Sequence, residues 1–139
     1  SARMMELAKA RNWGQNRVVF VTSGVEAWAG EMEYDCVLTG LFFDNFKEAH
    51  AVEIVRQVAP YLKQGGYWLE SDFYYPKKRG KLWQAILLQS MYISARLICG
   101  VEAKRLPDMD KIFLGEGFRV LYAGFHYQRF IRSVVYRKS

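Results

Sequence analysis

Small and polar residues that are suited to binding a ligand follow two apolar runs of the sequence. Thr39, Gly40 and Leu41 end the run at 36–38, and Asp72 closes the run that begins at Tyr67. A short apolar run ended by small or polar residues predicts a buried strand of a parallel sheet, covered on both faces. The carboxyl ends of such strands share one edge of the sheet and border a crevice. The sequence therefore predicts a small-molecule site at that edge.

Aromatic and acidic residues next to these strand ends are the candidate substrate contacts. Phe43 and Asp44 follow the first strand, and Tyr74 and Tyr75 follow Asp72. Phe43 either walls a pocket or belongs to the core, and Asp44 either caps the next helix or contacts the substrate. Asp72 would hold a substrate hydroxyl or accept a proton. The alternative for Asp72 and both tyrosines is an ordinary surface loop.

Helical and strand patterns alternate along the chain and would position these residues. Apolar residues at helical spacing predict helices, and β-branched and aromatic runs predict strands. The order predicts one α/β domain over residues 1–139, with a mostly parallel sheet, right-handed crossovers and a C-terminal antiparallel hairpin. The expected helices span 1–12, 25–32, 46–62, 81–99 and 108–115, and the expected strands span 17–22, 35–39, 67–73, 117–127 and 130–137.

The composition is that of a globular domain and limits the classes of function. Hydrophobic residues make up 51% and charged residues 24% of the chain, a mix that buries a core and is not typical of disorder. The net charge is +6, but Lys and Arg are scattered apart from a cluster at 77–79. A solvated basic surface is therefore favoured over nucleic-acid or acidic-lipid binding. No apolar run reaches the ~20 residues that a membrane span needs.

The N-terminal residues and the cysteines predict a cytoplasmic protein. The first five residues lead into a helical pattern without the features of a signal peptide. Cys36 and Cys99 lie far apart in apolar runs and match no metal motif, so we expect buried free thiols in a reducing compartment. No metal cluster and no Ser-His-Asp arrangement is indicated. His50 is expected on the solvated side of a helix.

Three strings of the sequence resemble those of class I S-adenosylmethionine-dependent methyltransferases. They are YDCVLTGLFFDNF at 34–46, YLKQGGYWLESDFYYP at 61–76 and MYISARLICGVEAKRLPDMDKIFLGEGF at 91–118. They look like a bacterial branch with the patterns FDLxxTxFFLDCF, LxPGGxWLxxDF and MYxFFRLxxGxxARRLPD…GF, of which the last is the most specific. The resemblance covers almost the whole chain. It implies S-adenosylmethionine as the cofactor and methyl transfer to a small, apolar or aromatic substrate.

The resemblance also implies positions for the cofactor. Thr39, Gly40 and Leu41 would pass beneath the sulfonium, where a small residue permits close approach. A loop after the strand at 17–22 would supply a backbone amide or an acidic side chain to the adenine, although Val25 stands where the acid of the family usually lies. Met4 would lie beside the ribose, because the residues 1–4 look like those that follow the ribose-binding acid. The loop consists of Ser23, Gly24, Val25 and Glu26.

The apolar helix expected at 81–99 would help to cover the substrate. Met91 and Tyr92 carry more apolar surface than one buried helix face requires, so they would roof the crevice or form the contact of a homodimer. Together with Phe43, Asp72, Tyr74 and Tyr75 they complete the candidate substrate contacts.

The sequence departs from the family in its first third. It contains neither the glycine-rich loop that cradles the methionine part of the cofactor nor the ribose-binding acid. The resemblance thus implies a domain that lacks its first two strands: a part of a longer protein, a truncated protein, or a chain completed by another. Without those strands the segment 17–22 loses its usual neighbour and an open edge is left.

Three functions remain open at this stage. The first is methyl transfer to a small molecule. The second is a non-catalytic, truncated methyltransferase-like fragment or interaction module, which the missing cofactor loop supports. The third is a nucleic-acid methyltransferase, supported by the basic charge but not by an Asn-Pro-Pro-Tyr-type motif after the central strand.

Overall fold

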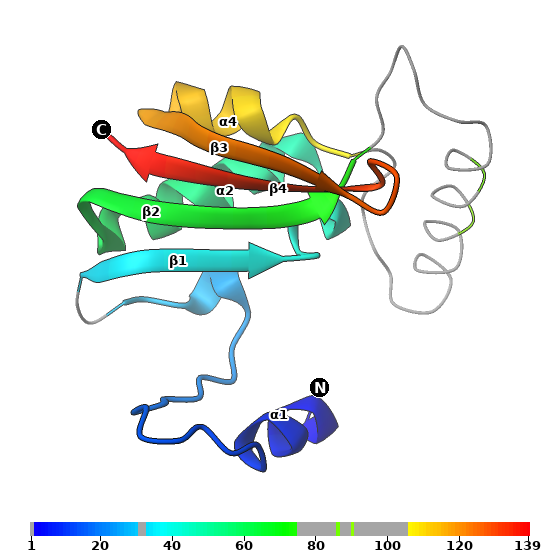
Figure 1. Ribbon diagram of the computed structural model, residues 1–139. Coiled ribbons are helices and arrows are strands. Elements are labelled where there is room, and N and C mark those ends of the chain that lie inside the picture. The colour runs from blue at the N-terminus through cyan, green and yellow to red at the C-terminus, as the bar shows by residue number, and fades with distance from the viewer. Residues whose placement is uncertain (1, 31–32, 75–85, 87–89, 91–105) are drawn as a thin grey trace.

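The computed structural model describes residues 2–30, 33–74, 86, 90 and 106–139. These residues form a four-stranded sheet in the order β1-β2-β4-β3, with helices α2 and α4 against one face (Figure 1).

The predicted α/β organisation is confirmed. The elements are α1 (Ala2–Lys9), β1 (Tyr34–Gly40), α2 (Glu48–Val58), β2 (Leu62–Phe73), α4 (Met109–Gly115), β3 (Phe118–His126) and β4 (Ile131–Lys138), with 3₁₀ turns η1 (Val25–Ala27), η2 (Phe43–Asn45) and η3 (Ala59–Tyr61). Most of the helix expected at 81–99 lies outside the described residues, as do Tyr75, Met91, Tyr92 and Cys99.

The described sheet is mixed: β1, β2 and β3 run in one direction, and β4 of the C-terminal hairpin runs in the opposite direction. β1 and β2 are parallel, whereas β4 pairs antiparallel with both β2 and β3. The segment 17–22, expected as a further strand, has no regular structure, and Val19 is 73% exposed. A strand needs a neighbour for its backbone hydrogen bonds, and among the described residues none pairs with this segment.

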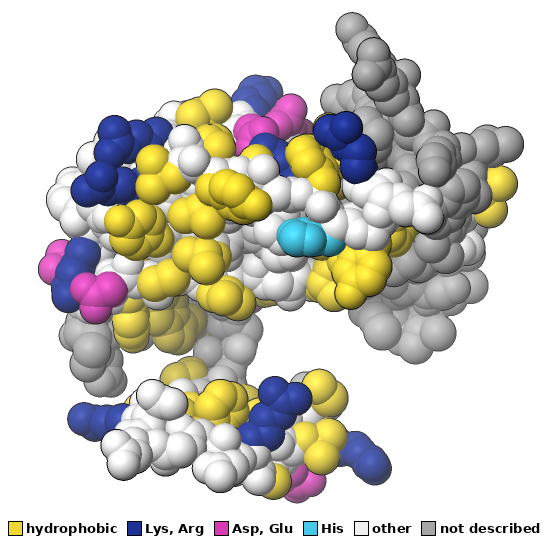
Figure 2. Space-filling view, viewed as in Figure 1, with side chains coloured by type: hydrophobic (Ala, Val, Ile, Leu, Met, Phe, Trp, Pro, Cys, Tyr) yellow, Lys and Arg dark blue, Asp and Glu magenta, His cyan; other side chains and the backbone are white. Residues whose placement is uncertain are grey.

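β1 is the edge strand of this sheet rather than a strand buried on both faces. Leu38 is 73% exposed, and Cys36 is exposed instead of buried as expected. Both helices that pack on the sheet lie behind it in Figure 1, and apolar side chains gather on the opposite face in Figure 2. Tyr67 and Tyr122 are among the exposed apolar residues of the sheet. The apolar sequence pattern of β1 is that of a strand covered on both faces, but the described helices cover only one face of the sheet.

Two boundaries differ from the predicted ones for identifiable reasons. Pro60 has no N–H, and α2 accordingly ends at Val58 in the 3₁₀ turn Ala59–Tyr61. The strand expected at 67–73 begins earlier, because residues 62–66 are the first part of β2, where Leu62 pairs with Tyr34 before the register shifts. Gly65 takes up that irregularity with a φ of +74°, which glycine adopts without strain.

The helix expected at 25–32 is reduced to the single 3₁₀ turn η1, and Trp28 after it is already extended. Residues 31 and 32 lie outside the description. With Gly24 before the turn and Gly30 after it, the local sequence gives little support to a longer helix.

The C-terminal elements lie close to their predicted positions. α4 begins after Asp108, whose side chain accepts the backbone N–H of Lys111 as an N-cap. β3 and β4 form the expected hairpin, but its turn spans Tyr127–Phe130, two residues more than expected. Tyr127, Gln128 and Arg129 all have positive φ there.

Aromatic side chains form the core between the sheet and its two helices. Trp68 is fully buried, and its ring lies 6.3 Å from Phe43, 5.0 Å from Phe113 and 6.0 Å from Phe118. Tyr136 stacks on Phe113 with ring centroids 4.1 Å apart. Such pairs add about 0.5–1.5 kcal/mol each beyond the burial of their area. This core holds β2 in place and thereby fixes the strand ends that the candidate site needs.

Candidate functional site

Asp72 ties the end of β2 to the turn that follows β1. Its Oδ2 accepts the backbone N–H groups of Phe42 at 3.2 Å and Asp44 at 3.1 Å, and its Oδ1 accepts that of Phe73 at 2.9 Å. Asp72 is only 6% exposed. The carboxylate therefore positions the turn after β1.

Asp44 lies beside the carboxylate of Asp72, and its pKa is unusually high for an aspartate. Burial, followed by the charge of Asp72, raises the pKa of Asp44 to about 7. Burial likewise raises the pKa of Asp72. Because the charge of Asp72 acts on Asp44, the titration of the one carboxyl depends on the protonation of the other. Asp44 lies within η2 and does not cap α2, whose N-cap residue is Lys47.

A second group of ionisable residues lies on the helix-facing side of β2 and β4. Glu70 is 5% exposed, and burial, followed by the charge of Asp72, raises its pKa to about 8 while Arg132 opposes the shift. Arg132 lies 2.8 Å from Asp110, and the hydroxyl of Tyr136 donates to the same carboxylate at 2.6 Å. Burial alone would raise the pKa of Asp110, but these two hydrogen bonds hold it below its usual value. Glu70 is therefore protonated at neutral pH while Asp110 is charged.

The end of β1 combines a fixed residue with an accessible one. The hydroxyl of Thr39 accepts the indole N–H of Trp68 at 3.1 Å and is thus turned towards the core. Beside Gly40 there is open space, because a Cβ built there would meet no atom within 4 Å. Leu41 follows with a φ of +49°, and its N–H donates to the carbonyl of Ser71 at 2.8 Å. This conformation costs a residue other than glycine about 1 kcal/mol, and such strain often marks functional sites.

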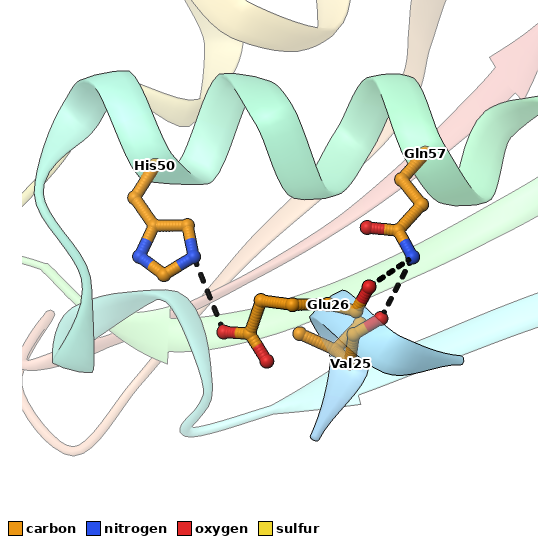
Figure 3. A network of polar contacts seen from close by, with 4 residues as sticks. All are labelled: Val25, Glu26, His50 and Gln57. Atoms are coloured by element: carbon orange, nitrogen blue, oxygen red, sulfur yellow. Dashed lines mark hydrogen bonds and ion pairs between the residues drawn. The ribbon is translucent and has the colours of Figure 1, made fainter. Parts of the chain in front are cut away.

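Gln57 of α2 anchors the loop that carries the candidate adenine contacts (Figure 3). Its Nε2 donates to the carbonyl oxygens of Val25 at 2.9 Å, Glu26 at 3.2 Å and Trp28 at 2.8 Å. One side chain thus holds three carbonyls of the loop that begins at Ser23, and it fixes η1 on the helix-covered side of the sheet.

Glu26 points to the first half of α2. Its Oε1 lies 3.2 Å from Nε2 of His50, whose ring also contacts Phe46 with centroids 4.9 Å apart (Figure 3). His50 is therefore a partner of Glu26 and not a freely solvated residue. The carboxylate also stands beside Gly24, where an added Cβ would meet Glu26 Oε2 at 2.7 Å. Because α2 follows the carboxyl end of β1, this pair lies towards the same end of the sheet as Gly40.

The structure brings part of the predicted site together. Thr39, Gly40, Leu41, Asp72 and Tyr74 lie at the adjoining ends of β1 and β2, where β1 and β2 remain paired up to Gly40 and Ser71. The N–H of Tyr74 donates to the carbonyl of Phe130 at 2.8 Å, and its ring packs on Phe125 at 5.1 Å.

Other predicted residues lie elsewhere. Phe43 is fully buried in the core, against the rings of Trp68 and Phe113. Met4 belongs to α1, which has no buried residue and stands apart from the sheet (Figure 1). The described structure therefore does not bring Met4 to the end of β1.

Sequence reasoning missed the network around Glu70 and the anchor Gln57. A signal for Glu70 existed, because it alternates with Trp68 and Asp72 and so shares their face of the strand. A carboxyl on a buried face is rarely without ionic or hydrogen-bonding neighbours. No local pattern marks Gln57, whose partners are 29–32 residues away in the chain.

Metal ions and membranes are two further kinds of partner to consider for the described residues. No group of three or more His, Cys, Asp and Glu side chains is arranged there to hold a metal ion. None of the helices in that part of the chain has the length and apolarity for crossing a membrane.

Comparisons with known proteins bear on the fold. No protein-family model and no curated protein matches the chain. Among solved structures, TnmH has a TM-score of 0.67 at 17% identity, over 87% of this chain and 35% of TnmH. The complex of LepI with SAM has a TM-score of 0.66 at 12% identity, over 84% and 29%. Magnesium protoporphyrin IX methyltransferase (ChlM) from Synechocystis PCC 6803, with bound SAH, has a TM-score of 0.63 at 20% identity, over 98% and 57%.

Each of these neighbours is much longer than the matched region. The chain spans 35% of TnmH, 29% of LepI and 57% of ChlM, and the low identities restrict the likeness to the fold. The sequence motifs and the structural neighbours agree on that fold. The chain accordingly has the fold of S-adenosylmethionine-dependent methyltransferases, over part of the length of the proteins that it resembles.

Proposed function

We propose that this chain is the C-terminal part of a class I methyltransferase domain that transfers a methyl group from S-adenosylmethionine to a small, apolar or aromatic molecule. The single observation that supports it most is the shared fold with proteins solved with SAM or SAH bound. In this proposal residues 1–139 form one partial domain. The glycine-rich loop and the first two strands would lie in a part of the domain outside this sequence.

The end of β1 has the properties that a cofactor site requires. Gly40 leaves open space where any larger residue would project, and Leu41 beside it is 51% exposed. Asp72 fixes the backbone after β1 through two N–H groups, so the approach surface is pre-formed. Gln57 similarly fixes the loop at 23–26, which would offer a backbone amide to the adenine ring. These residues would form only one part of a cofactor site, because the sequence does not contain the glycine-rich loop that completes it in the family.

The residues of this chain would bind and orient the reactants. Bound S-adenosylmethionine supplies an activated methyl group, so the protein has to align the acceptor and exclude water. Tyr74 stands at the end of β2 and is proposed as a substrate contact. Asp72 holds the turn after β1 through its hydrogen bonds, and Phe43 of that turn is buried in the core. Met4, Tyr75, Met91 and Tyr92 remain proposals from the sequence resemblance.

Calorimetric titration with S-adenosylhomocysteine tests this function. We expect weak or no binding by the 139-residue chain and micromolar binding by a chain extended at its N-terminus to include the glycine-rich segment. A micromolar dissociation constant for the monomeric 139-residue chain would show that the cofactor site has been misplaced.

An interaction module without catalysis is the second candidate, supported by the exposed apolar face in Figure 2. Leu38, Tyr67 and Tyr122 are 73%, 42% and 62% exposed on the sheet. An extended chain that folds but does not bind S-adenosylhomocysteine would favour this candidate. A nucleic-acid methyltransferase would be recognised by salt-dependent binding of RNA or DNA.

A further inference from the structure

The turn between β3 and β4 lies beside the end of β2 and has an unusual backbone (Figure 1). The N–H of Tyr74, which follows β2, donates to the carbonyl of Phe130 in this turn at 2.8 Å. Tyr127, Gln128 and Arg129 have φ values of +49°, +56° and +68°. Glycine adopts such values without strain, but they cost free energy in other residue types. Strain of this kind often marks a binding site, so the side chains of the turn are candidates for a binding role.

Arg129 of this turn holds its guanidinium over an aromatic ring and has no acidic partner among the described residues. Its Cζ lies 4.4 Å from the centre of the Phe125 ring. Arg132, whose Cζ lies 5.9 Å from the centre of the Tyr74 ring, is by contrast paired with Asp110 at 2.8 Å. A guanidinium that contacts a ring with its face keeps the N–H groups along its edge for an acceptor in its own plane. A carboxylate is such an acceptor and can take two parallel hydrogen bonds.

Two rings beside Arg129 form a platform for the rest of the ligand. The ring of Phe125 lies 5.1 Å from that of Tyr74. Phe125 is 38% exposed and Tyr74 is half-buried, so both leave apolar surface for a flat molecule. β2 lies between β1 and β4 in the sheet, and Gly40 of β1 pairs with Ser71 of β2. A ligand on this platform would therefore lie at the same end of the sheet as the proposed cofactor site.

We propose that the methyl acceptor is an aromatic carboxylic acid, with its ring on Tyr74 and Phe125 and its carboxylate bound to Arg129. The inference rests on the proposed function and deepens it, because it names an acidic group that the substrate carries. A carboxylate brings one negative charge to the one unpaired guanidinium beside the platform, whereas a phosphate would bring nearly two. The net charge of +6 also attracts an anionic ligand to the protein.

Titration of the ¹⁵N-labelled chain with benzoate tests the site through the Nε–H signals of its arginines and the amide signal of Tyr74. Benzyl alcohol has the same ring without the charge and is the comparator. We expect saturable shifts of the Arg129 and Tyr74 signals with benzoate and none with benzyl alcohol at the same concentrations. Arg119 is the internal control, because it is exposed at the other end of β3.

Three outcomes of this titration would overturn the proposal. Equal affinity for benzyl alcohol would show that the carboxylate is not recognised. Equal shifts of the Arg119 and Arg129 signals would show that benzoate is attracted only by the net charge. The third outcome is the absence of any saturable shift at about 10 mM benzoate.

Substitutions at the two arginines provide matched variants. Arg129→Gln removes the charge beside the platform and should weaken benzoate binding roughly tenfold or more. Arg119→Gln removes one charge from β3 and should leave the affinity within about twofold. Arg129→Gly should give the same loss as Arg129→Gln without risk to the turn, because glycine suits a φ of +68°. Unchanged benzoate affinity in a folded Arg129→Gly protein would contradict the assignment.

The titration separates this inference from the proposed function, because it requires no cofactor. An N-terminally extended chain that binds S-adenosylhomocysteine but not benzoate would overturn the inference and leave the proposed function intact. An extended chain that binds benzoate at Arg129 but not S-adenosylhomocysteine would contradict the proposed function and support the acid-binding site.

Discussion

Glu70→Gln is predicted to stabilise the fold at alkaline pH. Burial and the charge of Asp72 raise the pKa of Glu70 from 4.5 to about 8 against the opposing effect of Arg132. Between those pH values the folded protein holds a proton that the unfolded chain has released. The free energy of unfolding therefore falls as the pH rises through this window, and the loss is complete above it. Glutamine has almost the same volume and carries no charge at any pH.

The magnitude follows from the same two values. The interval from 4.5 to about 8 sets an upper limit of about 5 kcal/mol, at ~1.4 kcal/mol per pH unit. Relaxation around a buried charge raises the effective dielectric constant, so we expect about 2 kcal/mol in practice. At about pH 5 the wild-type side chain is neutral, and the variant should differ little from it.

Urea denaturation followed by tryptophan fluorescence measures the effect. The wild-type protein should be less stable at about pH 9 than at about pH 5, and Glu70→Gln should reduce that difference by about 2 kcal/mol, while the part that comes from Asp44 remains. Glu53→Gln replaces an exposed glutamate of α2 and should leave the difference unchanged. If wild type and Glu70→Gln lose the same free energy of unfolding between the two pH values, Glu70 does not carry the pH dependence.

Three further substitutions test the contacts around the site. Asp72→Ala removes the acceptor of three backbone N–H groups and should lower the free energy of unfolding by about 3 kcal/mol, at ~1 kcal/mol for each hydrogen bond. A decrease of less than about 1 kcal/mol in thermal denaturation would show that Asp72 does not hold the turn after β1. Leu41→Gly relieves the strain of a φ of +49° and should raise the free energy of unfolding, measured by urea denaturation, by about 1 kcal/mol. A lower free energy of unfolding would show that the contacts of the leucine side chain contribute more than the strain costs. Gln57→Ala frees three carbonyls of the η1 loop and should broaden the Trp28 indole signal, an effect that Gln64→Ala on β2 should not reproduce.

The sequence predicted those features that depend on neighbouring residues. A short helix was expected at 108–115, and α4 spans Met109–Gly115. The alternation of strand, helix and strand from 34 to 73 predicts two parallel strands joined by a helix, and β1 and β2 are such a pair. The helix expected at 46–62 ends early in the turn Ala59–Tyr61, where Pro60 has no N–H to continue it.

Features that depend on distant partners were not predictable from local patterns. The segment 17–22 has the residues of a strand, but without a neighbouring strand among the described residues it does not form one. Cys36 lies in an apolar run and is nevertheless exposed, because β1 is an edge strand. The partners of Asp72 are 28 and 30 residues away, so a candidate substrate contact could not be distinguished from a clamp on the turn.

The central claim is that the cofactor binds at the end of β1, and Gly40→Leu tests it most directly. The substitution should be tolerated by the fold, because a Cβ at Gly40 would meet no atom within 4 Å. Gly115→Leu is a matched control, since Gly115 also has open space beside it but ends α4. Affinity for S-adenosylhomocysteine would be measured by calorimetry in the N-terminally extended chain, with circular dichroism to verify folding. We predict that Gly40→Leu abolishes binding while Gly115→Leu retains it. Equal affinity in both folded variants would place the cofactor elsewhere and restrict the likeness to the fold.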